Sequence, residues 1–334
     1  MGSAHLTSLL KITHPLLQGG MSWVSRFELA AAVSEAGGLG VIGSGGMEPE
    51  ELRREIRSLR AQTTQTFGVN VPLLNVRPDG NAGIVEQLID VVCEESVPVV
   101  VTGAGTPRRF TERLHGANAL VLHVVPSVEL AQKCEQAGVD VIIAESQEAG
   151  GHVSVKGLSS FSLIPQVVDA VDVPVVAAGG IADARGVAAA LALGAAGVQV
   201  GTRFIATHEC NAHPAFKQAL LSASSESTAI YCRQAHASRA LVTPAVKKLL
   251  EMESEGRTVD ELIQFRGRGR AFEGCIEGNL DDGLLPSGSG AGLVQSTQTV
   301  AEVVAELTQG ATRILGDLGK AISPPARGSG TDAK

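Results

Sequence analysis

Residues 174–201 read PVVAAGGIADARGVAAALALGAAGVQVG, and this stretch decides how the chain is expected to fold. An apolar run rich in valine stands at each end, and the segment between them, 183–193, has the spacing of a helix. Asp183 is a typical residue for the start of a helix, and Gly194 for its end. The stretch therefore predicts a strand, a helix and a second strand, as in a parallel sheet that is buried on both faces.

The same unit recurs along the chain, and the number of units indicates the architecture. Eight βα units favour a closed (β/α)8 barrel, the TIM barrel, over a doubly wound sheet, although an open sheet would require only a different closure. The eight candidate strands are 15–19, 40–43, 67–71, 98–103, 120–125, 140–145, 174–179 and 197–201. The helical segments between them lie at 26–36, 49–61, 84–95, 107–115, 127–137, 161–171 and 183–193.

Three regions of different character follow from this pattern. Residues 1–205 should form the α/β barrel core with the ligand site. Residues 206–320 are mostly helical in pattern and should form an extension and cap that complete the same domain, including the polar, glycine-rich passage 265–283. Residues 321–334 lack apolar periodicity, which predicts a disordered tail.

The composition excludes several classes of protein. The net charge is −8 without a long run of Lys or Arg, so binding of nucleic acid is not expected. The five cysteines are odd in number and lack C-x-x-C spacing, which predicts reduced thiols in a cytoplasm. The histidines show no helical pair spacing, so no metal site is expected. The most continuous apolar stretch, 186–198, is shorter than the roughly 20 residues that span a bilayer, so no membrane segment is expected.

Glycine-rich loops follow the seventh and eighth predicted strands, at 177–183 and 199–204. In a barrel these are the loops that commonly bind phosphate groups, because glycine lets backbone N–H groups approach the phosphate oxygens. Thr202 and Arg203 would add a hydroxyl and a cation. The loops therefore predict a phosphorylated ligand, most simply flavin mononucleotide (FMN). The alternative is that the glycines only shape tight turns.

Other predicted strands also end in polar or glycine-rich residues. The sequence GGMS (19–22) follows the first strand. Asn70 lies within the third strand, where its side chain would form hydrogen bonds either to a flavin ring or to other groups of the protein core. The sixth strand ends in AESQEAGGH (144–152), which places His152 near the barrel mouth. A histidine there could transfer a proton near neutral pH, or it could be an ordinary exposed residue.

Five motifs together resemble one family. They are QGGMSWV, FGVNV, EAGGH, AAGGIAD and QVGTRFIATHECNAHP, and the resemblance spans about residues 5 to 320. The family is that of the flavin-dependent nitronate monooxygenases (2-nitropropane dioxygenases), which also contains the flavin-containing enoyl-acyl-carrier-protein reductase of bacterial fatty-acid synthesis. Within it, VVVTGAGTP (99–107) and HVVPSVELA (123–131) look more like the reductase branch.

This resemblance implies a TIM barrel with non-covalently bound FMN and, as expected for the family, a homodimer. His152 matches the active-site histidine of the family. The positions that would bind the cofactor are Gly20, Met21, Ser22, Asn70, Glu145, Gly150, Gly179, Gly180, Gln199, Val200, Gly201 and Thr202.

The resemblance leaves two redox reactions open. A reductase would use NADH or NADPH and an enoyl thioester, and His152 would donate a proton or stabilise the thioester oxygen. A nitronate monooxygenase would oxidise alkyl nitronates with O2, with His152 at the nitro oxygens or the α-proton. A barrel that binds a phosphorylated ligand without redox turnover is a third reading. Acyl carrier proteins are acidic, so docking of one would need a basic patch on this acidic chain. The alternative is that the arginine-rich segment is only a solvated turn. The candidate residues for the patch are Arg266, Arg268, Arg270, Arg108 and Arg109.

Overall fold

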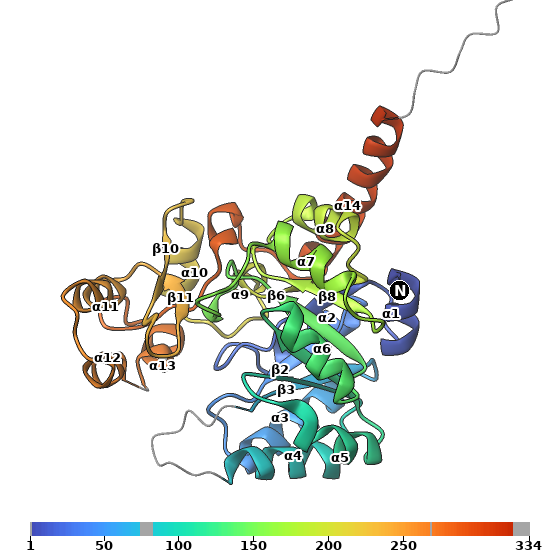
Figure 1. Ribbon diagram of the computed structural model, residues 1–334, viewed down its shortest axis with the longest axis horizontal. Helices are drawn as coiled ribbons and strands as arrows, with labels where there is room; N and C mark the ends of the chain where they lie inside the picture. Colours follow the sequence, from blue (N-terminus) through green and yellow to red (C-terminus); the bar gives the residue numbers. More distant parts are fainter. Residues whose placement is uncertain (1, 74–82, 268, 323–334) are drawn as a thin grey trace, which may run out of the picture.

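Eight parallel strands form a nearly closed barrel (Figure 1). The computed structural model describes residues 2–73, 83–267 and 269–322. The barrel strands are β1 (Leu16–Gln18), β2 (Gly40–Gly43), β3 (Phe67–Pro72), β4 (Val99–Gly103), β5 (Leu120–Val125), β6 (Val141–Glu145), β8 (Val175–Ala178) and β9 (Gly197–Val200). They follow the order β1, β9, β8, β6, β5, β4, β3, β2, and a parallel bridge between Leu17 and Leu39 joins the two ends. The predicted (β/α)8 barrel is confirmed, and each predicted strand is present.

The helices around the barrel also lie where the apolar spacing predicts them. They are α2 (Phe27–Glu35), α3 (Pro49–Gln62), α4 (Ile84–Glu94), α5 (Thr111–Gly116) after the 3-10 turn η1 (Pro107–Arg109), α6 (Val128–Gln136), α7 (Ser160–Val168) and α8 (Ala184–Ala192). The side chain of Asp183 accepts hydrogen bonds from the N–H groups of Arg185 and Gly186 at the start of α8. Gly194 has a φ of 96°, so it ends the helix in the left-handed conformation that favours glycine.

Replacing Asp183 with alanine should lower the free energy of unfolding by about 1 kcal/mol, because two N–H groups at the start of α8 lose their acceptor. The measurement is urea-induced unfolding. Ser127→Ala is the matched control, since Ser127 accepts one longer bond of 3.4 Å from Leu130 N–H at the start of α6. A loss for Asp183→Ala no larger than that for Ser127→Ala would contradict this account of the α8 cap.

A short helix that the sequence analysis did not predict closes the N-terminal end of the barrel. This helix, α1 (Ser3–Leu10), buries Leu6 and Leu10 among barrel-lining residues such as Leu17. Gly197 at the start of β9 leaves room for it, because an added Cβ would lie 2.5 Å from the Leu6 side chain. Helix α1 thus closes the N-terminal end of the barrel, and the polar residues of the strands lie at the C-terminal end.

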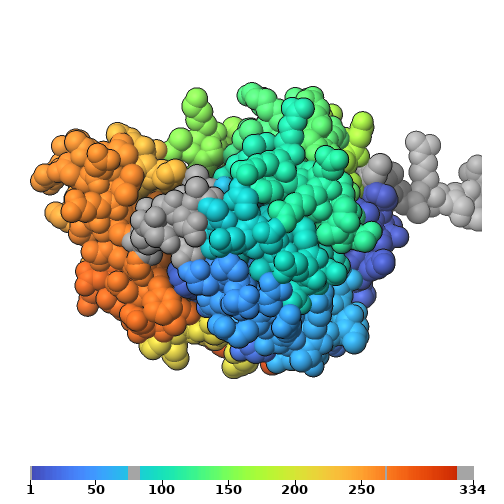
Figure 2. All heavy atoms as spheres, turned by 90° about the horizontal axis from the view of Figure 1, so that it is seen from below, coloured from blue at the N-terminus to red at the C-terminus, as the bar shows by residue number. Residues whose placement is uncertain are grey.

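The chain after β9 adds helices and, unexpectedly, two strands. Its elements are α9 (Thr202–Ile205), α10 (Pro214–Leu221), β10 (Thr228–Tyr231), β11 (Ser238–Leu241), α11 (Pro244–Ser254), α12 (Val259–Arg266), α13 (Arg270–Phe272), the π-helical turn η2 (Glu273–Glu277), the 3-10 turn η3 (Ser289–Leu293) and α14 (Val300–Ile322). Residues 228–267 and 269–272 form a lobe beside the barrel, which we call the cap lobe (Figures 1 and 2). Strands β10 and β11 pair with a two-residue strand, β7 (Gly151–His152), in an antiparallel sheet.

The last helix, α14, packs along α8 and buries Val303, Leu307 and Ala311. It continues to Ile322, so the first two residues of the predicted tail, 321–334, are helical, and the rest of that prediction lies outside the described residues. Within the described part of the chain, no helix combines the length and the apolar character needed to cross a membrane.

Candidate active site

Three polar side chains project into the barrel interior at its C-terminal end. They are Asn70 on β3, Glu145 on β6 and Gln199 on β9. Side chains alternate along a strand, and Ile143, two residues before Glu145, belongs to the interior cluster. The strand register sets Ala178 opposite both Glu145 and Gln199, so these side chains share one layer across neighbouring strands. The mouth of the barrel is therefore polar above an apolar interior.

Glu145 is the last residue of β6, and its environment favours the protonated acid. Burial raises the pKa of its carboxyl group to about 8. Among the described residues no side chain or backbone group bonds to this carboxyl. A largely neutral carboxylic acid at pH 7 can donate one hydrogen bond and accept others, so Glu145 can bond to a ligand in either sense.

The raised pKa of Glu145 predicts a loss of stability with rising pH. Between about pH 4.5 and pH 8 the folded chain keeps a proton on Glu145 that the unfolded chain releases, so the free energy of unfolding falls with pH in this window. Glu145→Gln should remove that loss. In the flavin-free protein the variant should gain stability over wild type from pH 4.5 to 8 in urea titrations, with little difference below pH 4. A difference that stays constant with pH would contradict the raised pKa.

The loop after β1 lies against the ends of β3 and β9. A Cβ added to Gly20 would overlap the Asn70 side chain, whose Cγ would be 2.9 Å away. Met21 contacts the other neighbour, because its sulfur would be 3.5 Å from a Cβ on Gly201. Val200 takes part through its backbone, as its carbonyl accepts a hydrogen bond of 2.9 Å from Gly19 N–H.

Further partners of the β1 loop complete its placement. Ser22, the third predicted residue of this loop, is exposed and lies against Gly45 after β2. The structure thus brings Gly20, Met21, Ser22, Asn70, Gln199, Val200 and Gly201 together at one side of the mouth.

Two amide side chains on this side, with unused hydrogen-bonding capacity, fit a flavin. Gln199 Oε1 is buried and has no hydrogen-bond partner among the described residues. Among the residues that the structure describes, the side chain of Asn70 has one hydrogen bond, a long one of 3.4 Å from Nδ2 to the carbonyl of Val101. A buried acceptor without a partner costs about 1–3 kcal/mol, a cost that is avoided when a ligand N–H or hydroxyl bonds to it. The ring and sugar-alcohol chain of FMN carry both kinds of group, so the residues present fit this cofactor.

The second side of the mouth is formed by two glycines with left-handed backbone. Gly179 and Gly180, after β8, have φ values of 100° and 74°. A Cβ on Gly179 would overlap the Ser146 hydroxyl, and one on Gly180 would lie 3.2 Å from Glu148. Both positions therefore require glycine for conformation and for space. Close backbone approach of this kind suits a phosphate, as the sequence predicts.

A segment missed by the sequence analysis covers these loops. Gly288 N–H donates a hydrogen bond of 2.9 Å to the hydroxyl of Thr202, the first residue of α9. Gly150 packs on the same segment, because an added Cβ would lie 2.6 Å from the carbonyl carbon of Ser287. The Ser287 hydroxyl is buried and lacks a partner among the described residues. The glycine- and serine-rich sequence at 286–292, PSGSGAG, was the available signal.

Three polar residues beneath the Gly179 loop were also missed. Ser160, at the start of α7, donates from its backbone N–H to Glu148 Oε2 at 2.8 Å and from its hydroxyl to the carbonyl of Gly179 at 3.1 Å. The Ser146 hydroxyl donates to the same carboxylate oxygen at 3.0 Å. This network ties the end of β6 to the loop after β8, and only the serine pair at 159–160 hinted at it.

The expected role of Arg203 is wrong. Its side chain is buried away from the glycine loops and donates to the carbonyl of Ser296 at 3.3 Å and to the side chain of Gln298. Arg203 therefore anchors the segment before α14 and does not supply a cation to a phosphate. A residue one position after Thr202 on a helix points to another face, which the linear motif did not take into account.

His152 lies in β7, where the cap lobe holds it. Its backbone pairs with Ser238 of β11, and its Nε2 lies 3.3 Å from Nη2 of Arg266 at the end of α12. The surrounding protein, the Arg266 guanidinium and His236 lower the pKa of the imidazole to about 4. One face of His152 stays exposed, so water screens part of this effect, but the direction favours a neutral imidazole at pH 7.

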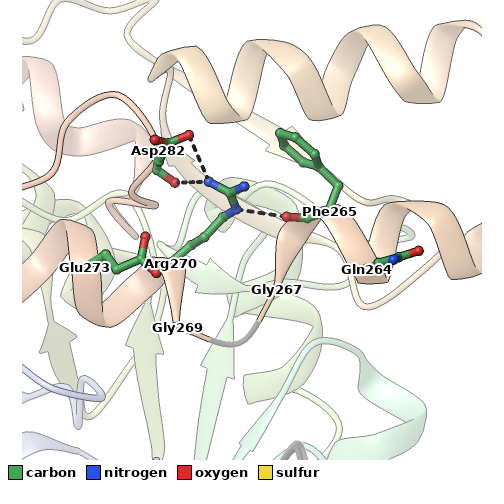
Figure 3. A pocket seen from close by; sticks show the side chains of 7 residues that line it. All are labelled: Gln264, Phe265, Gly267, Gly269, Arg270, Glu273 and Asp282. Carbon is green, nitrogen blue, oxygen red and sulfur yellow. Dashed lines mark hydrogen bonds and ion pairs between the residues drawn. The ribbon is translucent and has the colours of Figure 1, made fainter.

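The other predicted basic residues have different surroundings. Arg268 lies outside the described residues. Arg270 bonds to the carbonyl oxygens of Phe265 and Asp282, each at 2.8 Å, and to the Asp282 carboxylate at 3.2 Å (Figure 3). It thus joins the last turn of α12 to Asp282, beside a surface cavity of about 380 Å³ that Glu273 also lines.

Comparison with known proteins identifies the family of this chain. A family model for nitronate monooxygenase matches residues 3–310. A probable nitronate monooxygenase of Staphylococcus aureus (strain JH9) is 33% identical over 299 residues, which cover 78% of this chain and 81% of the relative. Two solved structures are also similar, and each alignment covers 95% of this chain and 99% of the other chain. FabK from Thermotoga maritima is 41% identical, with a TM-score of 0.89. A nitroalkane oxidase from Streptomyces ansochromogenes is 30% identical, with a TM-score of 0.81. The chain therefore belongs to the nitronate monooxygenase family and is an FMN-dependent oxidoreductase.

Proposed function

We propose that this protein is an enoyl thioester reductase that uses NADH or NADPH and FMN. The observation that carries the proposal is the 41% identity to FabK, an enoyl-acyl-carrier-protein reductase, against 30% to the nitroalkane oxidase at the same coverage of this chain. The reductase-like segments at 99–107 and 123–131 are consistent with it, since the first contains the end of β4 and the second the end of β5.

The residues at the mouth would divide the work between binding and chemistry. Gly179, Gly180 and the start of α9 would bind the phosphate, while Asn70 and Gln199 would bond to the polar edge of the flavin. Bound FMN would supply the redox chemistry that moves a hydride from the reduced nicotinamide to the β-carbon of the enoyl thioester, and solvent water would supply the proton that the α-carbon takes up. His152 would donate a hydrogen bond to the thioester oxygen, where negative charge develops.

The experiment compares two activities of one purified preparation. With NADH or NADPH, a crotonyl thioester should be reduced to the butyryl thioester with loss of one nicotinamide per product. With propyl-2-nitronate and no nicotinamide, oxygen consumption should be slower by at least about tenfold in kcat/KM. The reverse ranking would reject the reductase in favour of the monooxygenase.

Nitronate monooxygenase is the second candidate, favoured by the family model and by the Staphylococcus aureus relatives. In that reaction the hydrogen bond from His152 would go to a nitronate oxygen. The third hypothesis from the sequence, a barrel without redox turnover, is not supported, because the family is one of FMN-dependent oxidoreductases. A purified protein without flavin absorbance that also fails to bind added FMN would reject both redox candidates.

An acyl carrier protein is the proposed source of the thioester, and a homodimer is the proposed assembly. Arg108 and Arg109 are exposed in and around η1, although Arg109 already pairs with Glu86 at 2.6 Å. If docking depends on charge, added salt should lower kcat/KM more steeply for a crotonyl group carried by the acyl carrier protein than for the crotonyl thioester of a phosphate-free fragment of coenzyme A. Equal salt dependence would reject this docking, and sedimentation velocity tests the dimer.

A further inference from the structure

We propose that Arg266 is a positioning residue that holds His152 as a neutral imidazole with its proton on Nδ1. His152 then acts on the substrate as a hydrogen-bond donor and not as a base. This inference deepens the proposed function and rests on it for the identity of the substrate, but the state of His152 can be measured without any substrate.

Arg266 reaches His152 from a position that its own partners define. Its Nη2 lies 3.3 Å from His152 Nε2 and 3.2 Å from the hydroxyl of Ser238, and its Nη1 donates to the carbonyl of His236 at 3.2 Å. The guanidinium carbon stands 5.9 Å from the centre of the Tyr231 ring. Contacts to β10, β11 and the turn between them therefore fix the guanidinium beside the imidazole.

The same hairpin fixes the backbone of the histidine. Ser238 of β11 is the pairing partner of His152, and the N–H of Val153 donates to the carbonyl of Ala237 at 2.9 Å. Gly151, with a φ of 78°, lets the chain turn from β6 into this sheet. The backbone of His152 is thus held by β11, and its side chain is contacted by Arg266 of α12, whose guanidinium bonds to the same hairpin, so the contact between Arg266 and Nε2 is part of the cap lobe's own packing.

The chemistry of the guanidinium decides the tautomer. Arginine carries five N–H donors, has no acceptor and does not lose its charge in proteins. A nitrogen that it contacts must accept, so Nε2 carries the lone pair and the proton stands on Nδ1. Protonation of the ring would set a second cation 3.3 Å from Arg266, with His236 also facing it from the hairpin turn. The contact with Arg266 and the nearby positive charge therefore both favour a neutral imidazole with its proton on Nδ1.

This state restricts the reactions that His152 can support. With the Nε2 lone pair engaged, the side chain lacks a free acceptor with which to remove an α-proton from a neutral nitroalkane. The Nδ1–H remains available to an oxygen that gains negative charge. We therefore expect turnover of enoyl thioesters, or of preformed nitronate anions, without turnover of neutral nitroalkanes.

The direct test is ¹⁵N NMR of the histidine side chains in the FMN-loaded protein, with His152 assigned by the loss of its signals in His152→Gln. At pH 7 we expect Nε2 to have the chemical shift of an unprotonated nitrogen and Nδ1 that of a protonated one. Arg266→Gln should raise the pH at which His152 titrates, whereas Arg266→Lys, which keeps a donor-only cation, should preserve the tautomer. A ring protonated on Nε2 in wild type, or an unchanged titration in Arg266→Gln, would overturn the proposal.

Kinetics supply the second readout, with Arg257→Gln as the matched control. Arg257 precedes α12 at its other end and pairs there with Glu255 and Glu261. Arg266→Gln should lower kcat for the crotonyl thioester about tenfold with little change in KM, Arg266→Lys should recover most of this, and Arg257→Gln should stay within twofold. A loss confined to KM would overturn the positioning role. Failure of the reductase assay with the expected NMR result would reject the proposed substrate and leave the assignment of His152 standing.

Discussion

Replacing His152 with alanine should lower kcat for a crotonyl thioester by about 10²–10³-fold while the flavin stays bound. The imidazole supplies the hydrogen bond to the oxygen on which charge develops, and no backbone contact of β7 depends on it, because His152 pairs with Ser238 through the main chain. Flavin content is measured by absorbance, and turnover by loss of the nicotinamide.

Two further histidine variants separate the donor role from other causes. His152→Gln keeps an N–H donor and should recover part of the lost rate, which a general base would not do. His5→Ala removes an exposed histidine on α1, at the opposite end of the barrel, and should leave kcat unchanged. Full activity in His152→Ala with bound flavin would remove His152 from the mechanism.

Replacing Gly20 with valine should weaken FMN binding by roughly a hundredfold. Even the first added carbon would overlap the Asn70 side chain and approach Val41 to 3.3 Å, so the loop after β1 must move away from β3. That movement would separate Met21 and Ser22 from Asn70 and Gln199, the groups that we assign to the flavin. The measurement is the dissociation constant of FMN from fluorescence titration of the flavin-free protein.

The control is a glycine whose surroundings are open. Gly116, at the end of α5, has nothing within 4 Å of an added Cβ, so Gly116→Ala should leave FMN affinity within a factor of two. Tight FMN binding by Gly20→Val would show that the β1 loop is not part of the cofactor site.

The barrel could be predicted from the sequence because its signals are local. Strands buried on both faces give continuous apolar runs, and ends of helices such as α8 carry capping residues that can be read directly, as Asp183 and Gly194 show. The polar ends of β3, β6 and β9 were visible for the same reason, since each interrupts an apolar run. Their use in binding FMN stays a prediction.

What the sequence could not indicate depends on contacts between distant segments. Strand β7 has two residues and therefore no periodicity, and it exists because β11 pairs with it. Arg266 meets His152 only through the folding of the cap lobe, so no spacing rule links the two. The wrong role for Arg203 has the same origin, because adjacent residues on a helix face different neighbours.

In the proposed reaction, hydride passes from a nicotinamide through bound flavin to an enoyl thioester. Anaerobic mixing with NADH or NADPH tests it most directly, with the flavin absorbance near 450 nm as the signal (a general property of oxidised flavins). We expect bleaching by the nicotinamide and full recovery of the absorbance on adding one equivalent of crotonyl thioester. Flavin that either nicotinamide leaves oxidised, but that propyl-2-nitronate bleaches, would contradict it.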